Sequence, residues 1–224
     1  MSGMAMPAQG YPQAILPHAA DGLPVEVTLI ARLPDGAGDA AIRDAARRQR
    51  SHPGFVDALD EPSVRIGVLH NRLGDRSTVF TFLVGERGHP FHRHAGHRMF
   101  TAITGSAGAV LQFSTATGAC DVGDALQSIR IPPDSLFVVR FGGGTWHRFL
   151  PGRSNAGHPA LFAVSCHPDE CSGALDAGQR AAVIANRADI PMLTELLPVA
   201  MARDIDAAPQ TCIVLGGCLQ ASMP

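Results

Sequence analysis

Four of the chain's ten histidines lie within nine residues, in the stretch HPFHRHAGHRMFTAITG at positions 89–105. His92 and His94 are two residues apart, so their side chains leave an extended segment on the same face. A β scaffold offers two imidazoles to one metal ion in this way. We therefore interpret His92 and His94 as a pair of metal ligands, and His89 as a loop residue outside the site.

A third ligand must come from elsewhere in the chain, and His147 in the segment GGGTWHRF is the natural candidate. The three glycines before it let the backbone turn tightly at the start of a strand. Imidazole nitrogens suit Fe, Zn, Ni and Cu alike. The alternative is a pair of exposed loop histidines and an unrelated buried one.

The stretch 92–105 resembles the first signature of the cupin superfamily, which is His-x-His, three or four residues, Glu, six residues, and Gly. His92, His94 and Gly105 match this signature, but Arg98 stands at the Glu position. The segment GGGTWH resembles the second signature, with Gly142 where proline is usual. The matching motifs cover about 20 residues, and the resemblance implies a jelly-roll barrel that binds a metal ion.

Arg98 cannot replace a carboxylate ligand, because a guanidinium has no acceptor atom and carries a positive charge. Three interpretations follow. Three imidazoles hold the ion while Arg98 binds a substrate carboxylate; His97 supplies a fourth ligand; or Arg98 faces outward and the chain is a binding module without catalysis. Among cupin-like enzymes, three-histidine iron is the arrangement of thiol dioxygenases and of gentisate dioxygenase.

We therefore expect an Fe(II)-dependent dioxygenase that acts on a small, carboxylate-bearing substrate, with Arg98 as the catalytic and substrate-binding residue. Zn(II), Mn(II), Ni(II) and Cu(II) are the other candidate ions. Trp146 and Arg140 are further candidates for substrate contact, although Trp146 could equally fill the barrel. The alternatives are a Zn- or Mn-dependent isomerase or lyase that does no redox chemistry, and a cupin module that senses metal or ligand.

The rest of the sequence predicts a mainly β fold. Short runs rich in Val, Ile, Phe and Thr are separated by turn signals, with no regular helix between them, which favours an antiparallel sandwich or barrel. These runs are 25–33, 64–70, 78–84, 98–104, 107–113, 125–131, 135–141, 145–150 and 160–166.

Three segments follow from this pattern: a flexible N-terminal arm over 1–24, a cupin barrel over 25–170, and a helical C-terminal extension over 171–224 that packs on the barrel. The segment 38–50 interrupts the strands and predicts a helix, with Asp39 as its N-cap. In the extension, two alanine- and leucine-rich stretches predict two helices, the second starting at Pro191.

The charges are nearly balanced, with 18 basic and 20 acidic residues, so nucleic acid is not an expected partner. No apolar run reaches the roughly 18 residues that span a bilayer. We expect a cytoplasmic protein with an anionic small-molecule substrate and, from the resemblance, a homodimer. Cys166–Cys171 and Cys212–Cys218 are spaced too loosely for a zinc finger and are expected to be inert thiols, with a second metal or redox site as the alternative.

Overall fold

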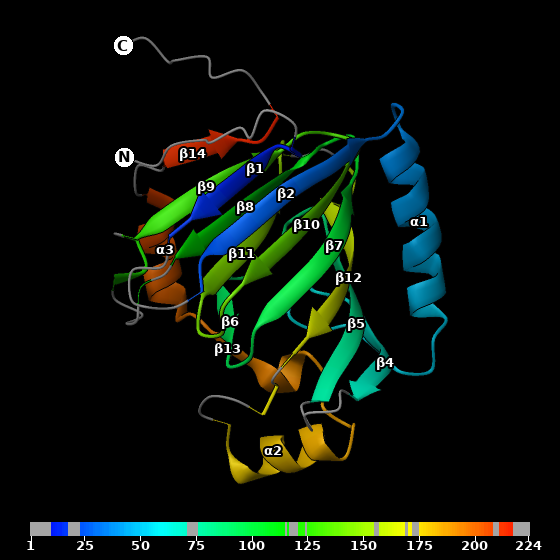
Figure 1. The fold of residues 1–224 in the computed structure, drawn as a ribbon, viewed down its shortest axis with the longest axis vertical. Helices are drawn as coiled ribbons and strands as arrows, with labels where there is room; N and C mark the ends of the chain where they lie inside the picture. The colour runs from blue at the N-terminus through cyan, green and yellow to red at the C-terminus, as the bar shows by residue number, and fades with distance from the viewer. Residues whose placement is uncertain are drawn as a thin grey trace.

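Two β-sheets form the body of the protein in the computed structural model (Figure 1). The structure describes residues 10–17, 23–70, 76–114, 116, 121–123, 125–154, 157–168, 170–171, 175–207 and 211–216. The predicted mainly β class is confirmed. The described strands form two sheets and no closed barrel, which is the sandwich of the two arrangements that the sequence pattern favoured.

The larger sheet has eight strands in the order β1-β2-β10-β7-β12-β5-β4-β3. Its neighbouring strands are antiparallel. Their bounds are β1 Gln13–Leu16, β2 Val25–Arg32, β3 Phe55–Val56, β4 Ser63–His70, β5 Arg76–Val84, β7 Arg98–Thr104, β10 Ser135–Phe141 and β12 Leu161–His167.

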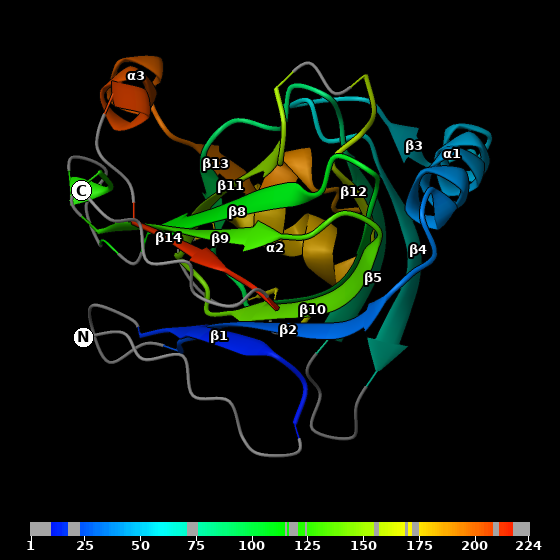
Figure 2. The same cartoon turned by 90° about the horizontal axis from the view of Figure 1, so that it is seen from above.

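The smaller sheet has six strands in the order β13-β6-β11-β8-β9-β14 and faces the larger one (Figure 2). Among the described strands of this sheet, β14 and β9 are the one parallel pair. The bounds are β6 His92–His94, β8 Ala109–Ser114, β9 Leu126–Ile131, β11 Trp146–Pro151, β13 Thr194–Leu196 and β14 Thr211–Val214.

The core lies between the two sheets because apolar residues alternate along the strands. In β7 and β10 every second side chain is buried, as the period of a strand requires. Aromatic rings from both sheets meet there in mostly edge-on pairs. The rings of this core are Phe80, Phe82, Phe100, Phe113, Phe137, Phe141 and Phe149.

The helix α1 (Ala37–Arg50) matches the helix predicted over 38–50 and lies outside the larger sheet (Figure 2). Its buried residues Ile42 and Ala46 pack against Leu83, whose side chain leaves β5 on the outer face. Asp39 does not cap this helix. Its carboxylate instead accepts a hydrogen bond from the backbone N–H of Ser106 at 2.9 Å.

The C-terminal region departs from the prediction of two helices. The first helix is present as α2 (Ala177–Ile184), but the second is replaced by a 3-10 turn η2 (Pro191–Leu193), the strand β13 and the helix α3 (Val199–Ala207). Residues 194–196 pair with β6, and this pairing outweighs their helical pattern. The region is therefore not purely helical.

The expected N-terminal arm also contributes to the sheet, since β1 pairs with β2. The remainder of that arm, residues 1–9 and 18–22, lies outside the described residues. No helix in the described part of the chain is both long and apolar enough to cross a membrane.

Candidate metal centre

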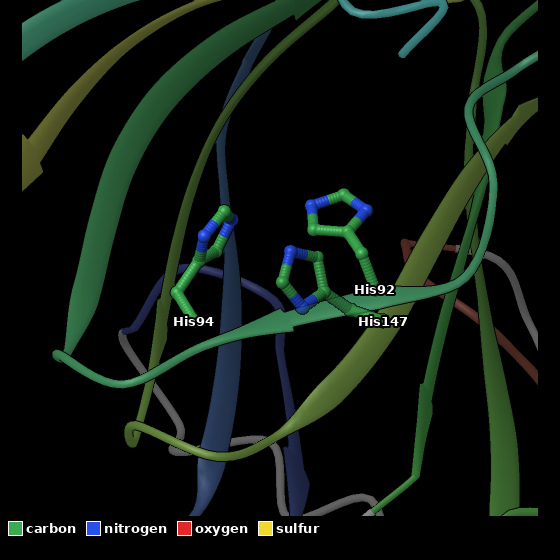
Figure 3. Close-up of side chains that lie close together, drawn as sticks. All are labelled: His92, His94 and His147. Carbon is green, nitrogen blue, oxygen red and sulfur yellow. The ribbon is translucent and has the colours of Figure 1, made fainter. Parts of the chain in front are cut away.

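The three predicted ligands lie on two neighbouring strands of the smaller sheet (Figure 3). His92 and His94 both point inward from β6, while Arg93 between them points to the other side. The antiparallel register of β6 and β11 places His147 opposite His92. One donor atom from each of the three imidazoles lies within 4.8 Å of the other two, so the structure brings the predicted triad together.

Backbone carbonyl groups fix the orientation of all three rings. Because a carbonyl oxygen only accepts hydrogen bonds, each Nδ1 must carry the proton, and the lone pair is left on Nε2. Metal-binding histidines are commonly held in this way. The bonds run from Nδ1 of His92 to Pro90 O at 2.9 Å, from His147 to Thr145 O at 3.0 Å and from His94 to Leu193 O at 3.2 Å.

The protonation of these rings suits a metal ion. Burial lowers the pKa of His92 to about 4 and the pKa values of His94 and His147 well below the usual range. The three imidazoles are therefore neutral at physiological pH, which is the form that ligates. His92 Nε2 is buried and has no hydrogen-bond partner among the described residues, so the donor set fits a divalent cation.

A buried carboxylate, Glu61, adjoins the triad. It precedes β4 and is 5% exposed, and its Oε2 lies 3.8 Å from His92 Nε2. Burial raises the pKa of Glu61 to about 8, although the charge of Arg98 opposes that rise. No sequence signal pointed to this residue, because Glu61 lies 31 positions before His92 and belongs to no motif.

His89 lies in the loop between β5 and β6, as predicted, but its side chain is buried. Its ring centroid is 4.6 Å from that of His92, and its Nδ1 donates to the carbonyl of Pro90 at 3.0 Å. Glu61, His89 and His92 form a second group of donor atoms within 4.8 Å of one another. Because His92 has only one free nitrogen, the two groups cannot use it for two separate ions.

Arg98 points into the interior from the start of β7 and is 4% exposed. Its NH1 donates to the carbonyl oxygens of His97 and Gly96 at 2.9 and 3.2 Å, and its Nε has no hydrogen-bond partner in the described structure. Burial lowers the pKa of Arg98 to about 10, while Glu170 and Glu61 oppose the shift. Arg98 therefore remains a cation beside the triad.

A small void of about 20 Å³ separates Arg98 from the ligands, with room for about one water-sized molecule. Its walls combine apolar side chains with five ionisable ones. They are Glu61, Phe82, His94, Arg98, Phe100, Phe141, His147, Phe149, His167 and Ile190. A second, open pocket of about 380 Å³ includes His94 and the Arg93–Glu195 ion pair in its wall.

A second imidazole–carboxylate pair lies across the void from the triad. His167 Nδ1 donates to Glu170 Oε1 at 3.0 Å, and Thr78 Oγ1 donates to Glu170 Oε2 at 2.8 Å. The ring centroids of His167 and His94 are 6.3 Å apart. Burial lowers the pKa of His167 to about 4, so its ring is neutral and its Nε2 can accept a proton. No sequence motif signalled this pair.

Three other predicted site residues lie away from the triad. His97 Nδ1 accepts a hydrogen bond from the Gly143 N–H at 3.0 Å, and His97 belongs to neither donor group. Arg140 faces outward from β10, where it pairs with Glu26 at 2.6 Å. The substrate contact expected of Arg140 therefore has no structural basis.

Trp146 is fully buried, but on the face of β11 opposite to His147. There it packs with Phe91 and Leu197, and the guanidinium of Arg93 lies 4.5 Å from its ring centroid. It does not line the void next to the triad. Of the two roles considered for Trp146, packing is the one that its position supports.

Cys166, Cys171 and Cys212 are free thiols, and neither donor group among the described residues contains a cysteine. Burial raises the pKa of the Cys166 thiol, which makes it less reactive at neutral pH. Cys120 and Cys218 lie outside the described residues.

No protein-family model and no curated protein matches this chain. Several solved structures are distantly similar. The capsular polysaccharide assembling protein CapF from Staphylococcus aureus has a TM-score of 0.40 and 14% identity, over 66% of this chain and 33% of CapF. A protein from Shewanella oneidensis has a TM-score of 0.41 and 9% identity, over 68% of this chain and 96% of that one.

The sugar epimerase NovW from Streptomyces spheroides has a TM-score of 0.32 and 13% identity, over 78% of this chain and 75% of NovW. This chain spans about one third of the length of CapF. Likenesses this distant carry no argument about activity, so the function must be inferred from the site residues themselves.

Proposed function

We propose that this protein is a metal-dependent enzyme, and that it is an Fe(II)-dependent dioxygenase of a small carboxylate-bearing substrate. The observation that carries the proposal is the triad itself. His92, His94 and His147 are buried and neutral, and each Nδ1 is bound to a carbonyl group so that Nε2 is left to ligate. Zn(II), Mn(II), Ni(II) and Cu(II) remain alternative ions, since imidazole suits them as well.

Held by the neutral imidazoles of His92, His94 and His147, a divalent ion would keep its full charge and would supply Lewis acidity and a place to bring two reactants together. The phenylalanine rings around the void exclude bulk water and lower the local dielectric. Under these conditions the electrostatic interactions between the substrate and the side chains of the site are stronger than they would be in water. This environment favours chemistry on a charged substrate.

Arg98 is the residue that would bind the substrate's carboxylate. Its planar guanidinium can form two parallel hydrogen bonds with a carboxylate, and its Nε is buried without a partner. The position of Arg98 in the wall of the void directs this interaction toward the triad. The void of about 20 Å³ holds only a water-sized molecule, so a carboxylate that reaches Arg98 must displace side chains of its wall.

The test is O₂ consumption by the protein reconstituted with Fe(II) without air, using a panel of two- to four-carbon hydroxy, keto and thiol carboxylates. We expect at least one acid to start O₂ uptake. Arg98→Gln should raise the KM for that acid more than it lowers kcat. Fe(II)-loaded protein that consumes no O₂ above the acid-free rate with any member of the panel would contradict the dioxygenase proposal.

A second candidate is a non-redox isomerase or lyase, and the pair His167–Glu170 favours it. Glu170 fixes the tautomer of His167, which leaves Nε2 to accept a proton from a substrate carbon. Such a reaction needs a base and an ion but no O₂. His167 lines the same void as Arg98, His94 and His147, and this position supports its role as the base.

The two candidates are separated by incubating the same acids with Zn- or Mn-loaded protein in D₂O without O₂. An isomerase or lyase would exchange a carbon-bound hydrogen for deuterium, detected by proton NMR. His167→Gln should abolish that exchange without lowering the metal content. Absence of exchange with every acid would contradict the second candidate.

A further inference from the structure

We propose that Glu61 is a ligand of the ion that the triad holds, and so supplies the carboxylate that the position of Arg98 lacks. This inference rests on the proposed metal centre and extends its ligand set. Glu61 reaches the site from the segment before β4, on the opposite sheet from His92 and His147.

The carboxylate of Glu61 lies next to the imidazole of His92. His92 Nδ1 donates to Pro90 O, so Nε2 carries a lone pair, and that lone pair lies 3.8 Å from Glu61 Oε2. Neither atom has a hydrogen-bond partner in the described structure. A separation of 3.8 Å is too long for a hydrogen bond between them.

A divalent ion satisfies both atoms at this separation. Zinc lies at about 2.0–2.2 Å from nitrogen and oxygen donors, so two ligands of one such ion are separated by about 3–4 Å. The 3.8 Å between Oε2 and Nε2 falls within this interval. The pair therefore needs little rearrangement to share an ion.

Glu61 is a better candidate than His89 for the additional ligand because it lines the void. Glu61, His94 and His147 line the same void, whereas His89 does not contribute to its wall. His89 lines a different, open pocket on the outer side of the molecule. Glu61 shares a group of donor atoms within 4.8 Å with His92 but not with His94 or His147, so its side chain must rotate into the void to share one ion with the whole triad.

Glu170 differs from Glu61 in its hydrogen bonds, and this difference supports Glu61 as the metal ligand. Both carboxylates are buried, Glu61 in the wall of the void and Glu170 next to His167. The two oxygens of Glu170 accept hydrogen bonds from His167 and Thr78. Glu61 Oε2 has no such partner. An unpaired buried carboxylate is strongly unfavourable, and a metal ion removes this cost.

Chelator competition with Zn(II) on metal-free protein tests the assignment. Glu61→Gln keeps the shape but removes the anionic donor, and should weaken Zn(II) binding by at least about 10-fold. The matched control, Glu170→Gln, removes an equally buried carboxylate and should leave the affinity unchanged. Glu61→Met should show the same loss if the glutamine variant fails to fold. The visible spectrum of bound Co(II) should change with Glu61→Gln alone.

The outcomes separate this inference from the proposed function. If Glu61→Gln binds Zn(II) as the wild type does and gives the same Co(II) spectrum, Glu61 is not a ligand, while the triad stands. If His89→Gln weakens binding as much as Glu61→Gln, and His147→Ala leaves it intact, the ion lies in the second donor group. That result would overturn both proposals.

Discussion

The inner and outer faces of the strands around the triad differ in how their polar groups are satisfied. On the inner face, His92, Glu61 and Arg98 each have a buried atom without a hydrogen-bond partner among the described residues. On the outer face, Arg93 pairs with Glu195 and lies over Trp146, and Arg140 pairs with Glu26. The side chains on the two faces of these strands therefore lie in different environments.

This difference indicates which side chains are available for chemistry. A folded protein rarely leaves several buried polar atoms unpaired in one place unless a ligand, ion or water completes them. On the outer face, the charged groups of Arg93 and Arg140 already have partners within the protein. The buried Nε1 of Trp146 has no hydrogen-bond partner among the described residues, but the ring packs with Phe91 and Leu197. Substitutions on the outer face should therefore change the free energy of unfolding without changing the affinity for metal. Substitutions on the inner face should change the affinity for metal more than the free energy of unfolding.

The largest expected effect is on stability, from Trp146→Ala. Trp146 is fully buried with Phe91 and Leu197, so truncation should lower the free energy of unfolding by about 3–5 kcal/mol. The affinity of the folded variant for Zn(II) should stay at the wild-type level. Urea unfolding and chelator competition measure the two quantities. A variant of normal stability that has lost its affinity for Zn(II) would indicate that Trp146 contributes to the metal site and not to packing.

The buried titratable groups on the inner face should make the stability of the metal-free protein depend on pH in an unusual way. The pKa values of His92 and His167 are lowered to about 4, so the unfolded chain binds protons below pH 6.5 that the folded chain does not. Stability should therefore fall from pH 6.5 toward pH 4, by up to about 1.4 kcal/mol per pH unit for each histidine.

Glu61 acts in the opposite direction. Its pKa of about 8 means that the folded protein keeps a proton that the unfolded chain loses above about pH 4.5. Stability should then also fall between pH 6.5 and 8, by at most about 1.4 kcal/mol per pH unit. Urea unfolding with a chelator present should show an optimum near pH 6.5. The alkaline slope should vanish in Glu61→Gln; a slope that persists in this variant would contradict the assignment.

A smaller effect is expected for His97, which tests its role as a fourth ligand. His97→Ala removes the acceptor for the Gly143 N–H and should lower the free energy of unfolding by about 1 kcal/mol. Zn(II) affinity should not change. A loss of affinity comparable to that of the triad variants would restore His97 to the ligand set.

The smallest effect is expected for Arg140→Gln on the outer face of β10. Its ion pair with Glu26 is exposed to solvent, with 58% of the Arg140 side chain accessible. Loss of the pair should change the free energy of unfolding by less than about 1 kcal/mol. Metal affinity and any KM for a carboxylate should be unaffected. A raised KM would revive the predicted substrate contact.

The strands could be predicted well from the sequence because their pattern is local. The runs 98–104 and 135–141 agree with β7 and β10 to the residue, since alternation of apolar side chains needs no information from elsewhere. The strand β13 was missed. Its three residues acquire their conformation from pairing with β6, and the leucines near them also suit a helix.

The only site residues that could be predicted are those whose spacing in the sequence forms a recognisable pattern. His92 and His94 share a face because they are two apart on a strand, and a glycine turn marks His147. Glu61, just before β4, and His167, at the end of β12, lie at the site because segments that are distant in the sequence pack together. No residue spacing in the sequence predicts such contacts. Trp146 and Arg140 were chosen for their residue type, and the strand alternation places both on the outer face.

The central claim is that one divalent ion binds to His92, His94 and His147. Titration of metal-free protein with Co(II), followed by visible absorption, tests it most directly. We predict saturation at one ion per chain and a spectrum typical of nitrogen donors. In His147→Ala the affinity should fall by on the order of 100-fold. Failure of the wild type to bind Co(II) stoichiometrically, or undiminished binding by His147→Ala, would contradict the account.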